Sequence, residues 1–368
     1  MAEIRADYFD YLRHFIATLE KRLAKSLEPD ERRRLSAKRH QQQRRLATLK
    51  DRLARLKADH ANGTVRLCFG GRKRLNGVYS SPDCIDNEPE PMRWGARKHP
   101  REPERRSAME HTHGALIEQL EGLETTAVAF SGGADSTLLL ALARKQLGAE
   151  RVIALTAVTP YMVRQEIGDA VALTTKLAVR HELVEIPMPE GMEHNPADRC
   201  YRCKRAMYGQ LLESAAEYGF ASLLDGSNTD DADEQCPGLR ALRELGIRSP
   251  FIEAGIDKAA VRQMARELDL PTWHKPTTAC LLTRIGFNVR VSMDQLQRIE
   301  EAERFLTQLG YTWVRVRCHG DLARIEVAPV QRERLLSDAG AVIEGIQRFG
   351  FRYVAMDLAG YQSGSMAG

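Results

Sequence analysis

The chain has 368 residues, a hydrophobic share of 43% and a formal net charge of +4. This length leaves room for two or three domains. The sequence has no apolar run long enough to cross a bilayer and no secretion-signal segment near its start, so we expect a cytoplasmic protein without membrane contact. Seven cysteines is an odd number, which favours thiols, metal ligands or reactants over a disulfide framework.

Charge is divided unevenly along the chain. Residues 1–108 carry 26 Lys and Arg against 15 Asp and Glu, whereas residues 109–368 carry 28 against 35. The first part is therefore basic and the second acidic. This asymmetry indicates two units with different partners or origins.

The basic part is predicted to be a helical extension over residues 1–79 followed by a linker over residues 80–108. Leucines recur at helical spacing, so residues 8–58 are expected to form two helices broken near Pro29. Their basic face is a candidate nucleic-acid surface, although most charge runs are simply solvated helix faces. The stretch around residues 30–80 also resembles a fragment of the transposases of small insertion elements. The linker carries five prolines among charges, which predicts little core.

Residues 109–285 are predicted to form an α/β domain with a doubly wound parallel sheet. Short apolar strands alternate with helices in this region, the pattern typical of parallel sheets. Ligands bind beyond the carboxyl ends of such strands. The expected strands are 127–130, 151–158, 181–186 and 221–225, and the expected helices are 110–122, 135–147, 162–178, 204–218 and 257–268.

Residues 286–368 are predicted to form a smaller α+β domain. Ser292 followed by Gln295 fits a capping box at the start of a helix over residues 292–309. The other expected elements are strands 313–318 and 323–327, a helix over 330–348 and a strand over 351–356.

The turn after the first strand carries the motif Ser131-Gly132-Gly133-Ala134-Asp135-Ser136. Glycines permit tight backbone turns, and Asp and Ser suit the start of a helix. Free backbone N–H groups converge at such a turn and bind phosphate. The motif resembles the PP-loop of ATP pyrophosphatases, whereas the Walker pattern is absent. This resemblance implies an adenine nucleotide alpha-hydrolase-like fold and cleavage of ATP between its α and β phosphates.

Three cysteines are candidates for chemistry. Cys200 and Cys203 form a Cys-x-x-Cys pair, which can chelate a metal, hold an iron–sulfur cluster or cycle as a redox dithiol. A second such pair, which a zinc ribbon requires, is missing. Cys280 lies between Lys275 and Arg284, which favour its thiolate if they face it. The alternative for all three is a small core side chain.

The order of motifs over residues 110–366 resembles the LarE family. They include Asp-Arg-Cys-Tyr-Arg-Cys-Lys, Asp-Gly-Ser-Asn, Lys-Pro-x-x-Ala-Cys and Arg-Val-Arg. LarE proteins are ATP-dependent sulfur transferases that build the nickel-pincer nucleotide cofactor. The resemblance implies that ATP adenylates a carboxylate of a pyridinium dicarboxylic acid mononucleotide, that a protein sulfur then attacks, and that AMP leaves a thiocarboxylate. It also implies a homo-oligomer.

Roles for individual residues follow from the same resemblance. The PP-loop residues Ser131, Gly132, Gly133, Asp135 and Ser136 would hold ATP phosphates together with Mg²⁺. Arg315 and Arg317 lie two apart on a predicted strand and so share a face, which fits a fork for the substrate phosphate. A solvated strand face is the alternative. Glu303 and Arg324 match further polar positions of that site.

The sulfur source divides the family. Members with one cysteine sacrifice its sulfur, whereas others pair it with a Cys-x-x-Cys. Cys200, Cys203 and Cys280 resemble the second type, in which three thiolates hold a [4Fe-4S] cluster and leave one iron open. Cys236 lies where the family more often has arginine. Three interpretations are open: Cys236 is an extra ligand, its presence removes a phosphate contact, or the change is neutral.

Two other functions fit parts of the sequence. One is a [4Fe-4S]-dependent enzyme that thiolates transfer RNA, although an acidic segment over residues 109–368 is unfavourable for a polyanion. The other is a nucleic-acid-binding protein acting through the basic arm and carrying a degenerate ATPase-like domain, although the PP-loop is intact.

Overall fold

The computed structural model describes residues 2–5, 47, 50, 54, 65–68, 102–231, 237–276 and 278–361. The chain divides into two compact units, Met1–His111 and Thr112–Gly368. In the first unit, β1 (Ala2–Arg5) pairs in parallel with β2 (Val65–Cys68), which was not predicted. Most of the basic arm, residues 80–101 of the proline-rich linker and Cys236 lie outside the described residues, whereas residues 102–108 of the predicted linker form the start of α3 (Glu102–Glu121), which was predicted to begin at residue 110. None of the helices described is long and apolar enough to cross a membrane.

The second unit is built on a four-stranded sheet in which every paired strand is parallel, in the order β5-β4-β3-β6. The predicted parallel α/β fold is thus confirmed. Each strand begins and ends within two residues of its predicted bounds. The strands are β3 (Thr126–Ala129), β4 (Val152–Val158), β5 (Arg180–Glu185) and β6 (Leu223–Leu224).

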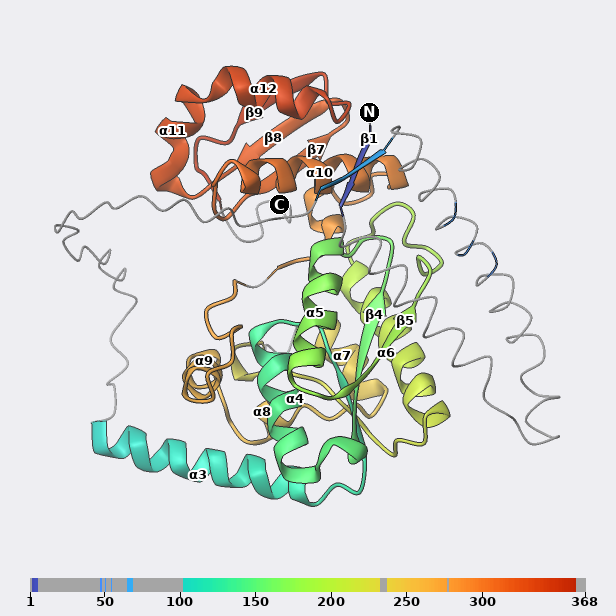
Figure 1. Ribbon diagram of the computed structural model, residues 1–368, viewed down its shortest axis with the longest axis vertical. Coiled ribbons are helices and arrows are strands. Elements are labelled where there is room, and N and C mark those ends of the chain that lie inside the picture. The colour runs from blue at the N-terminus through green and yellow to red at the C-terminus, as the bar shows by residue number, and fades with distance from the viewer. Residues whose placement is uncertain are drawn as a thin grey trace. The chain divides into compact units, whose positions relative to one another are not determined.

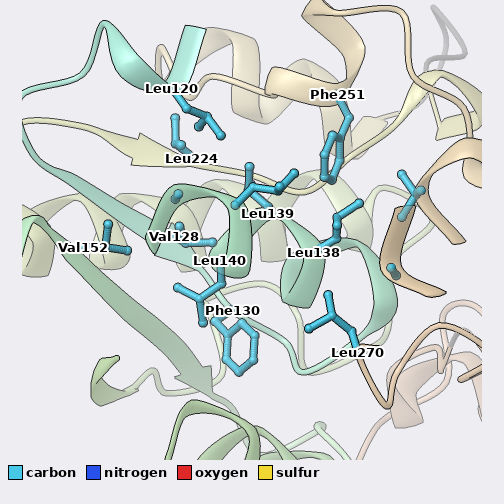
Figure 2. Packing of buried hydrophobic residues seen from close by; sticks show 14 of the residues in the cluster. Leu120, Val128, Phe130, Leu138, Leu139, Leu140, Val152, Leu224, Phe251 and Leu270 are labelled. Atoms are coloured by element: carbon cyan, nitrogen blue, oxygen red, sulfur yellow. The ribbon is translucent and has the colours of Figure 1, made fainter. Parts of the chain in front are cut away.

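Helices cover both faces of this sheet (Figure 1). Alternate side chains of a strand point to opposite faces, so Val128 packs into one core and Ala127 into the other. Figure 2 shows the first core, where Leu138, Leu139 and Leu140 of α4 pack against the sheet. Helices with residues in this core are α3 (Glu102–Glu121), α4 (Ala134–Leu147), α5 (Arg164–Lys176), α8 (Pro250–Glu253) and α9 (Lys258–Glu267), and the other core is covered by α6 (Arg199–Glu217) and α7 (Pro237–Glu244).

The start of α6 differs from the prediction. The helix begins at Arg199, five residues before the expected position. Pro196 precedes it and donates no backbone hydrogen bond, which made the segment resemble a loop. As a consequence Cys200 and Cys203 lie at the beginning of a helix. The short helices α7 and α8 were not predicted.

The C-terminal part adds a three-stranded sheet, in which β7 and β8 are antiparallel and β8 and β9 parallel. The capping box is confirmed, because Ser292 Oγ accepts from Gln295 N and Gln295 Oε1 accepts from Ser292 N. The helix predicted over 330–348 is broken at Asp338. The elements are α10 (Met293–Gln308), β7 (Arg315–His319), β8 (Leu322–Glu326), α11 (Arg332–Ser337), α12 (Ala339–Gln347) and β9 (Tyr353–Met356).

The two sheets of the second unit are joined by a shared core. Tyr161, which follows β4, and Met192 pack with residues of α10, β7 and β8. The backbone N–H of Leu281 donates to the carbonyl of Tyr161 at 2.9 Å. The segment around Cys280 is therefore held between the parallel sheet and the C-terminal sheet.

Candidate active site

The PP-loop lies at the carboxyl end of β3, as the sequence predicted. Gly133 is the N-cap of α4, and Gly132 has a positive φ of 72°. A Cβ at Gly132 would lie 3.2 Å from the Cα of Ala170 in α5. Both its backbone angle and this close approach therefore require glycine at position 132.

Two serine hydroxyls close the turn. The Oγ atoms of Ser131 and Ser136 are 3.0 Å apart, and Ser136 Oγ also accepts from the backbone N–H of Ser131 at 3.2 Å. The backbone N–H of Gly133 donates to Ser131 Oγ at 3.3 Å. Ser136 is buried whereas Ser131 is exposed, so Ser131 presents its hydroxyl at the mouth of the turn.

Asp135 connects the PP-loop to two other segments. Its Oδ1 accepts from Asn228 Nδ2 at 3.0 Å, and its Oδ2 pairs with Lys258 at the start of α9. A Cβ at Gly226 would lie 3.1 Å from the backbone N of Ser136, so the turn after β6 packs directly on the start of α4. Lys258 was missed by the sequence analysis, since nothing in its local motif distinguishes it from a surface lysine.

Lys275 also points to the PP-loop. Its Nζ donates to the carbonyl of Gly132 at 3.2 Å and pairs with Asp169 at 3.1 Å. Burial raises the pKa of the neighbouring Glu166, against a hydrogen bond from Thr278 and the charge of Lys275. Lys275 therefore supplies positive charge at the PP-loop.

Cys203 and Cys280 pack against the same buried core, and the three cysteines interact electrostatically. Burial raises the pKa of Cys203 to about 11, and the nearby Cys280 and Cys200 contribute to the increase. Burial likewise raises the pKa of Cys280, with Cys200 as the next cause. Tyr161 is buried, and its hydroxyl lies 3.1 Å from Cys203 Sγ. All three cysteines are free thiols.

Arg284 holds the backbone next to Cys280. This fully buried side chain forms a two-point ion pair with Glu303, with both N···O distances at 2.9 Å. Its Nη1 donates to the carbonyl oxygens of Ala279 at 2.7 Å and Cys280 at 3.0 Å. The positive charges of Arg284 and Arg199 lower the pKa of Cys280, but burial outweighs them.

Three of the four residues predicted at the substrate phosphate are paired with other side chains. Glu303 accepts from Arg284 and from the backbone N–H of Val316 at 2.9 Å. Buried Arg317 forms a two-point pair with Glu326, at 2.9 and 2.7 Å. Arg324 pairs with Glu326 at 3.5 Å and with Asp357 at 3.2 Å. Their assignment to phosphate stays a prediction.

Arg315 is different. It lies on β7 two residues from Arg317, and within the described part of the chain it forms no ion pair. Its Nη1 donates to the carbonyl of Val314 at 2.7 Å, and its guanidinium lies 5.1 Å from the ring centroid of Tyr361. Burial lowers the pKa of Arg315, and the charge of Arg284 adds to this. A phosphate at this position would relieve that concentration of positive charge.

The sequence is similar to those of several known proteins. Residues 116–199, which include the PP-loop, match the NAD synthase family. A pyridinium-3,5-bisthiocarboxylic acid mononucleotide synthase of Lactiplantibacillus plantarum, a LarE protein, is 35% identical over 253 residues, which are 68% of this chain and 92% of that protein.

The chain belongs to the LarE family.

Two further relatives extend the match across distant organisms. An uncharacterised protein of Synechocystis is 40% identical over 248 residues, covering 66% of this chain and 92% of that protein. An uncharacterised protein of Methanocaldococcus jannaschii is 31% identical over 236 residues, covering 64% and 90%. Membership of LarE and of the PP-loop proteins makes ATP the expected nucleotide of this chain.

Proposed function

We propose that this chain is an ATP-dependent sulfur transferase that adenylates a carboxylate of a pyridinium dicarboxylic acid mononucleotide and converts it to a thiocarboxylate for nickel-pincer nucleotide synthesis. One observation carries the proposal. Lys275 contacts the PP-loop, and Cys280, five residues later, packs against the same core as Cys203 and interacts electrostatically with Cys200. A single short segment therefore connects a phosphate-binding turn to a group of thiols. The name of the 35% identical relative supports the choice of substrate.

The residues around the PP-loop suit the phosphates of ATP. The turn offers backbone N–H groups at the start of α4, and Lys258 and Lys275 add two positive charges. Asp135 supplies a carboxylate oxygen, the kind of ligand that Mg²⁺ prefers. Because Lys258 already pairs with Asp135, a bound Mg²⁺ would share that carboxylate with the lysine. This arrangement favours departure of pyrophosphate.

Activation must precede sulfur transfer, because a carboxylate is a poor electrophile. Adenylation turns one carboxylate oxygen into a bridge to the α phosphorus, and AMP then becomes the leaving group. We assign the phosphate of the mononucleotide to Arg315, which, of the three arginines predicted at this site, forms no ion pair among the described residues. The adjacent Arg317 stays with Glu326 and fixes the strand face on which Arg315 lies.

The thiols are the proposed source or carrier of sulfur. Among the described residues, no three His, Cys, Asp or Glu side chains are grouped so that they hold one metal ion. A [4Fe-4S] cluster distributes its thiolates over separate irons, and the three interacting thiols fit such a group in their chemistry. When bound, it would offer an iron site for an extra sulfide. Without it, Cys280 would be the sacrificial donor. Cys200, Cys203 and Cys280 would be the ligands.

The proposal is tested by incubating the full chain with ATP, Mg²⁺ and the pyridinium dicarboxylic acid mononucleotide. AMP and pyrophosphate are measured together with the mass of the nucleotide product. We expect both to appear only with the mononucleotide, and the product to gain sulfur in place of oxygen. Release of ADP and phosphate, or AMP without a thiocarboxylate, would contradict the proposal.

The alternative functions gain no support. The comparisons do not favour the iron–sulfur enzyme that thiolates transfer RNA, because the named relative is a mononucleotide synthase. The hypothesis of nucleic-acid binding through residues 1–79 concerns a part of the chain that lies almost entirely outside the described residues.

A further inference from the structure

Arg199 is a buried cation that pairs with no anion in the described part of the chain. Only 7% of the residue's surface is exposed, yet its Nε and Nη1 atoms have no hydrogen-bond partner among the described residues. The one interaction shown for the guanidinium is a stack on the ring of Phe287, at 4.2 Å from the centroid. A buried charge without a partner is unfavourable, and it is usually retained where a ligand completes it.

The obvious partner of Arg199 is already engaged. Asp198, the preceding residue, pairs through its carboxylate with Arg202, at 2.8 and 2.9 Å. Among the described residues no other carboxylate forms an ion pair with Arg199. The adjacent carboxylate of Asp198 therefore pairs with the exposed Arg202, and the buried Arg199 has no ion-pair partner among the described residues.

Arg199 lies at the thiols. It is the first residue of α6, directly before Cys200, and its charge acts on Cys280 from the second segment. The start of a 19-residue helix adds the partial positive charge of the helix dipole. Two independent features thus place positive charge next to Cys200.

We propose that Arg199, together with the first turn of α6, binds a small monovalent anion beside Cys280. This inference rests on the proposed function, which supplies two anions of that chemistry. One is the carboxylate of the substrate, and the other is hydrosulfide, the small reduced-sulfur anion that replaces a transferred sulfur. The site is small because the guanidinium is nearly enclosed, and a phosphate is assigned elsewhere, to Arg315.

A pair of alkylating reagents tests the site without ATP or the mononucleotide. Iodoacetate is a small anion and iodoacetamide is its neutral counterpart, and both attack the same thiolate. The ratio of their rates at one cysteine therefore reports anion binding and not the thiolate fraction. Rates at Cys200 and Cys280 are measured by peptide mass spectrometry on the full chain in its thiol form, with the urea-unfolded chain as the reference.

We expect the ratio in the folded chain to exceed the reference by about tenfold, which corresponds to one charge-assisted hydrogen bond. Arg199→Gln should bring it back to the reference, and Arg199→Lys should keep part of it. Arg205→Gln, at an exposed arginine of the same helix that pairs with Glu244 and not with Asp198, is the matched control and should leave the ratio high. Excess thiocyanate should slow iodoacetate alone. An equal ratio in the native chain and Arg199→Gln overturns the proposal, and circular dichroism establishes that each variant is folded.

Steady-state kinetics identify the anion. If Arg199 holds hydrosulfide, Arg199→Gln raises the KM for sulfide and leaves the KM for the mononucleotide unchanged. If it holds the substrate carboxylate, the KM for the mononucleotide rises instead. No change in either constant overturns the site. A chain that makes no thiocarboxylate disproves the proposed function, whereas the alkylation ratio still decides whether Arg199 binds anions.

Discussion

The hydroxyl of Tyr161 lies 3.1 Å from Cys203 Sγ, and burial raises the pKa of both groups. Tyr161 follows the strand next to the PP-loop strand, whereas Cys203 belongs to α6. The carbonyl of Tyr161 also accepts from Leu281, the residue after Cys280. Tyr161 thereby connects both cysteine segments to the parallel sheet, one through its side chain and the other through its backbone carbonyl.

The first prediction concerns the pH dependence of Cys203 in the thiol form. Its pKa is raised from 9.0 to about 11, so the fold favours the protonated thiol. The stability that this provides is present below pH 9 and is lost as the pH rises toward 11. Alkylation of Cys203 by iodoacetamide should therefore keep accelerating up to about pH 11, as peptide mass spectrometry measures.

Tyr161→Phe tests the cause of this behaviour. The tyrosine hydrogen bond lowers the pKa of Cys203 against burial, so its removal should raise that pKa further and slow alkylation at every pH below it. Cys318, which is buried in the C-terminal core, is the internal control and should react as before. Faster alkylation of Cys203 in the variant would show that the hydroxyl only shields the thiol.

The second prediction concerns the pair formed by Arg284 and Glu303. Glu303→Gln leaves the charge of a fully buried arginine uncompensated, so the free energy of unfolding should fall by about 3 kcal/mol. Urea denaturation measures it. Glu301→Gln, which breaks the more exposed pair with Arg304, is the control and should change it by less than about 1 kcal/mol. Equal losses in the two variants would mean that the buried ion pair stabilises the fold no more than the exposed pair does.

The third prediction concerns the turn itself. Gly132→Ala places a methyl group 3.2 Å from the Cα of Ala170 at a positive φ, so it should separate the PP-loop from α5 and weaken ATP binding at least tenfold. Gly148→Ala also has a positive φ, but no atom lies within 4 Å of its Cβ. Both variants should lose about 1–3 kcal/mol of stability. Only Gly132→Ala should lose affinity for ATP, as measured by calorimetry. Unchanged affinity in this variant would mean that the turn does not bind the nucleotide.

The fourth prediction separates the two sulfur sources. Iron and acid-labile sulfide are measured per chain after anaerobic purification. About four of each would match one cluster, with repeated turnovers when sulfide is supplied. A metal-free chain that acts once and converts Cys280 to dehydroalanine would make this cysteine sacrificial, and would leave Cys200 and Cys203 without a role in transfer.

Much of the parallel sheet could be predicted from the sequence, because the residues that specify each strand and turn are close together in the chain. The run before Ser131 is apolar and the glycines and helix starters follow at once, so strand, turn and helix all fall within a few residues. The capping box at Ser292 is equally local. The start of α6 was placed too late, because Pro196 and Asp198 resemble a loop until the helix beyond them packs on the sheet.

The partners of the arginines could not be predicted in the same way. The spacing of Arg315 and Arg317 places them on one face of β7, but only the register with β8 shows that Glu326 takes Arg317. Lys275 is close to Cys280 in sequence, yet it contacts a carbonyl 143 residues away. The partner of each charged side chain depends on which segments the fold brings together, and a local sequence pattern does not indicate this.

The central claim is that ATP activates a carboxylate of the substrate by transferring its adenylyl group. The most direct measurement uses the mononucleotide with oxygen-18 in both oxygens of its carboxylates, and the AMP formed is analysed by mass spectrometry. Our account predicts one oxygen-18 atom in AMP for every thiocarboxylate produced, because the bridging oxygen leaves with the α phosphate. Unlabelled AMP, or label in inorganic phosphate, would contradict it.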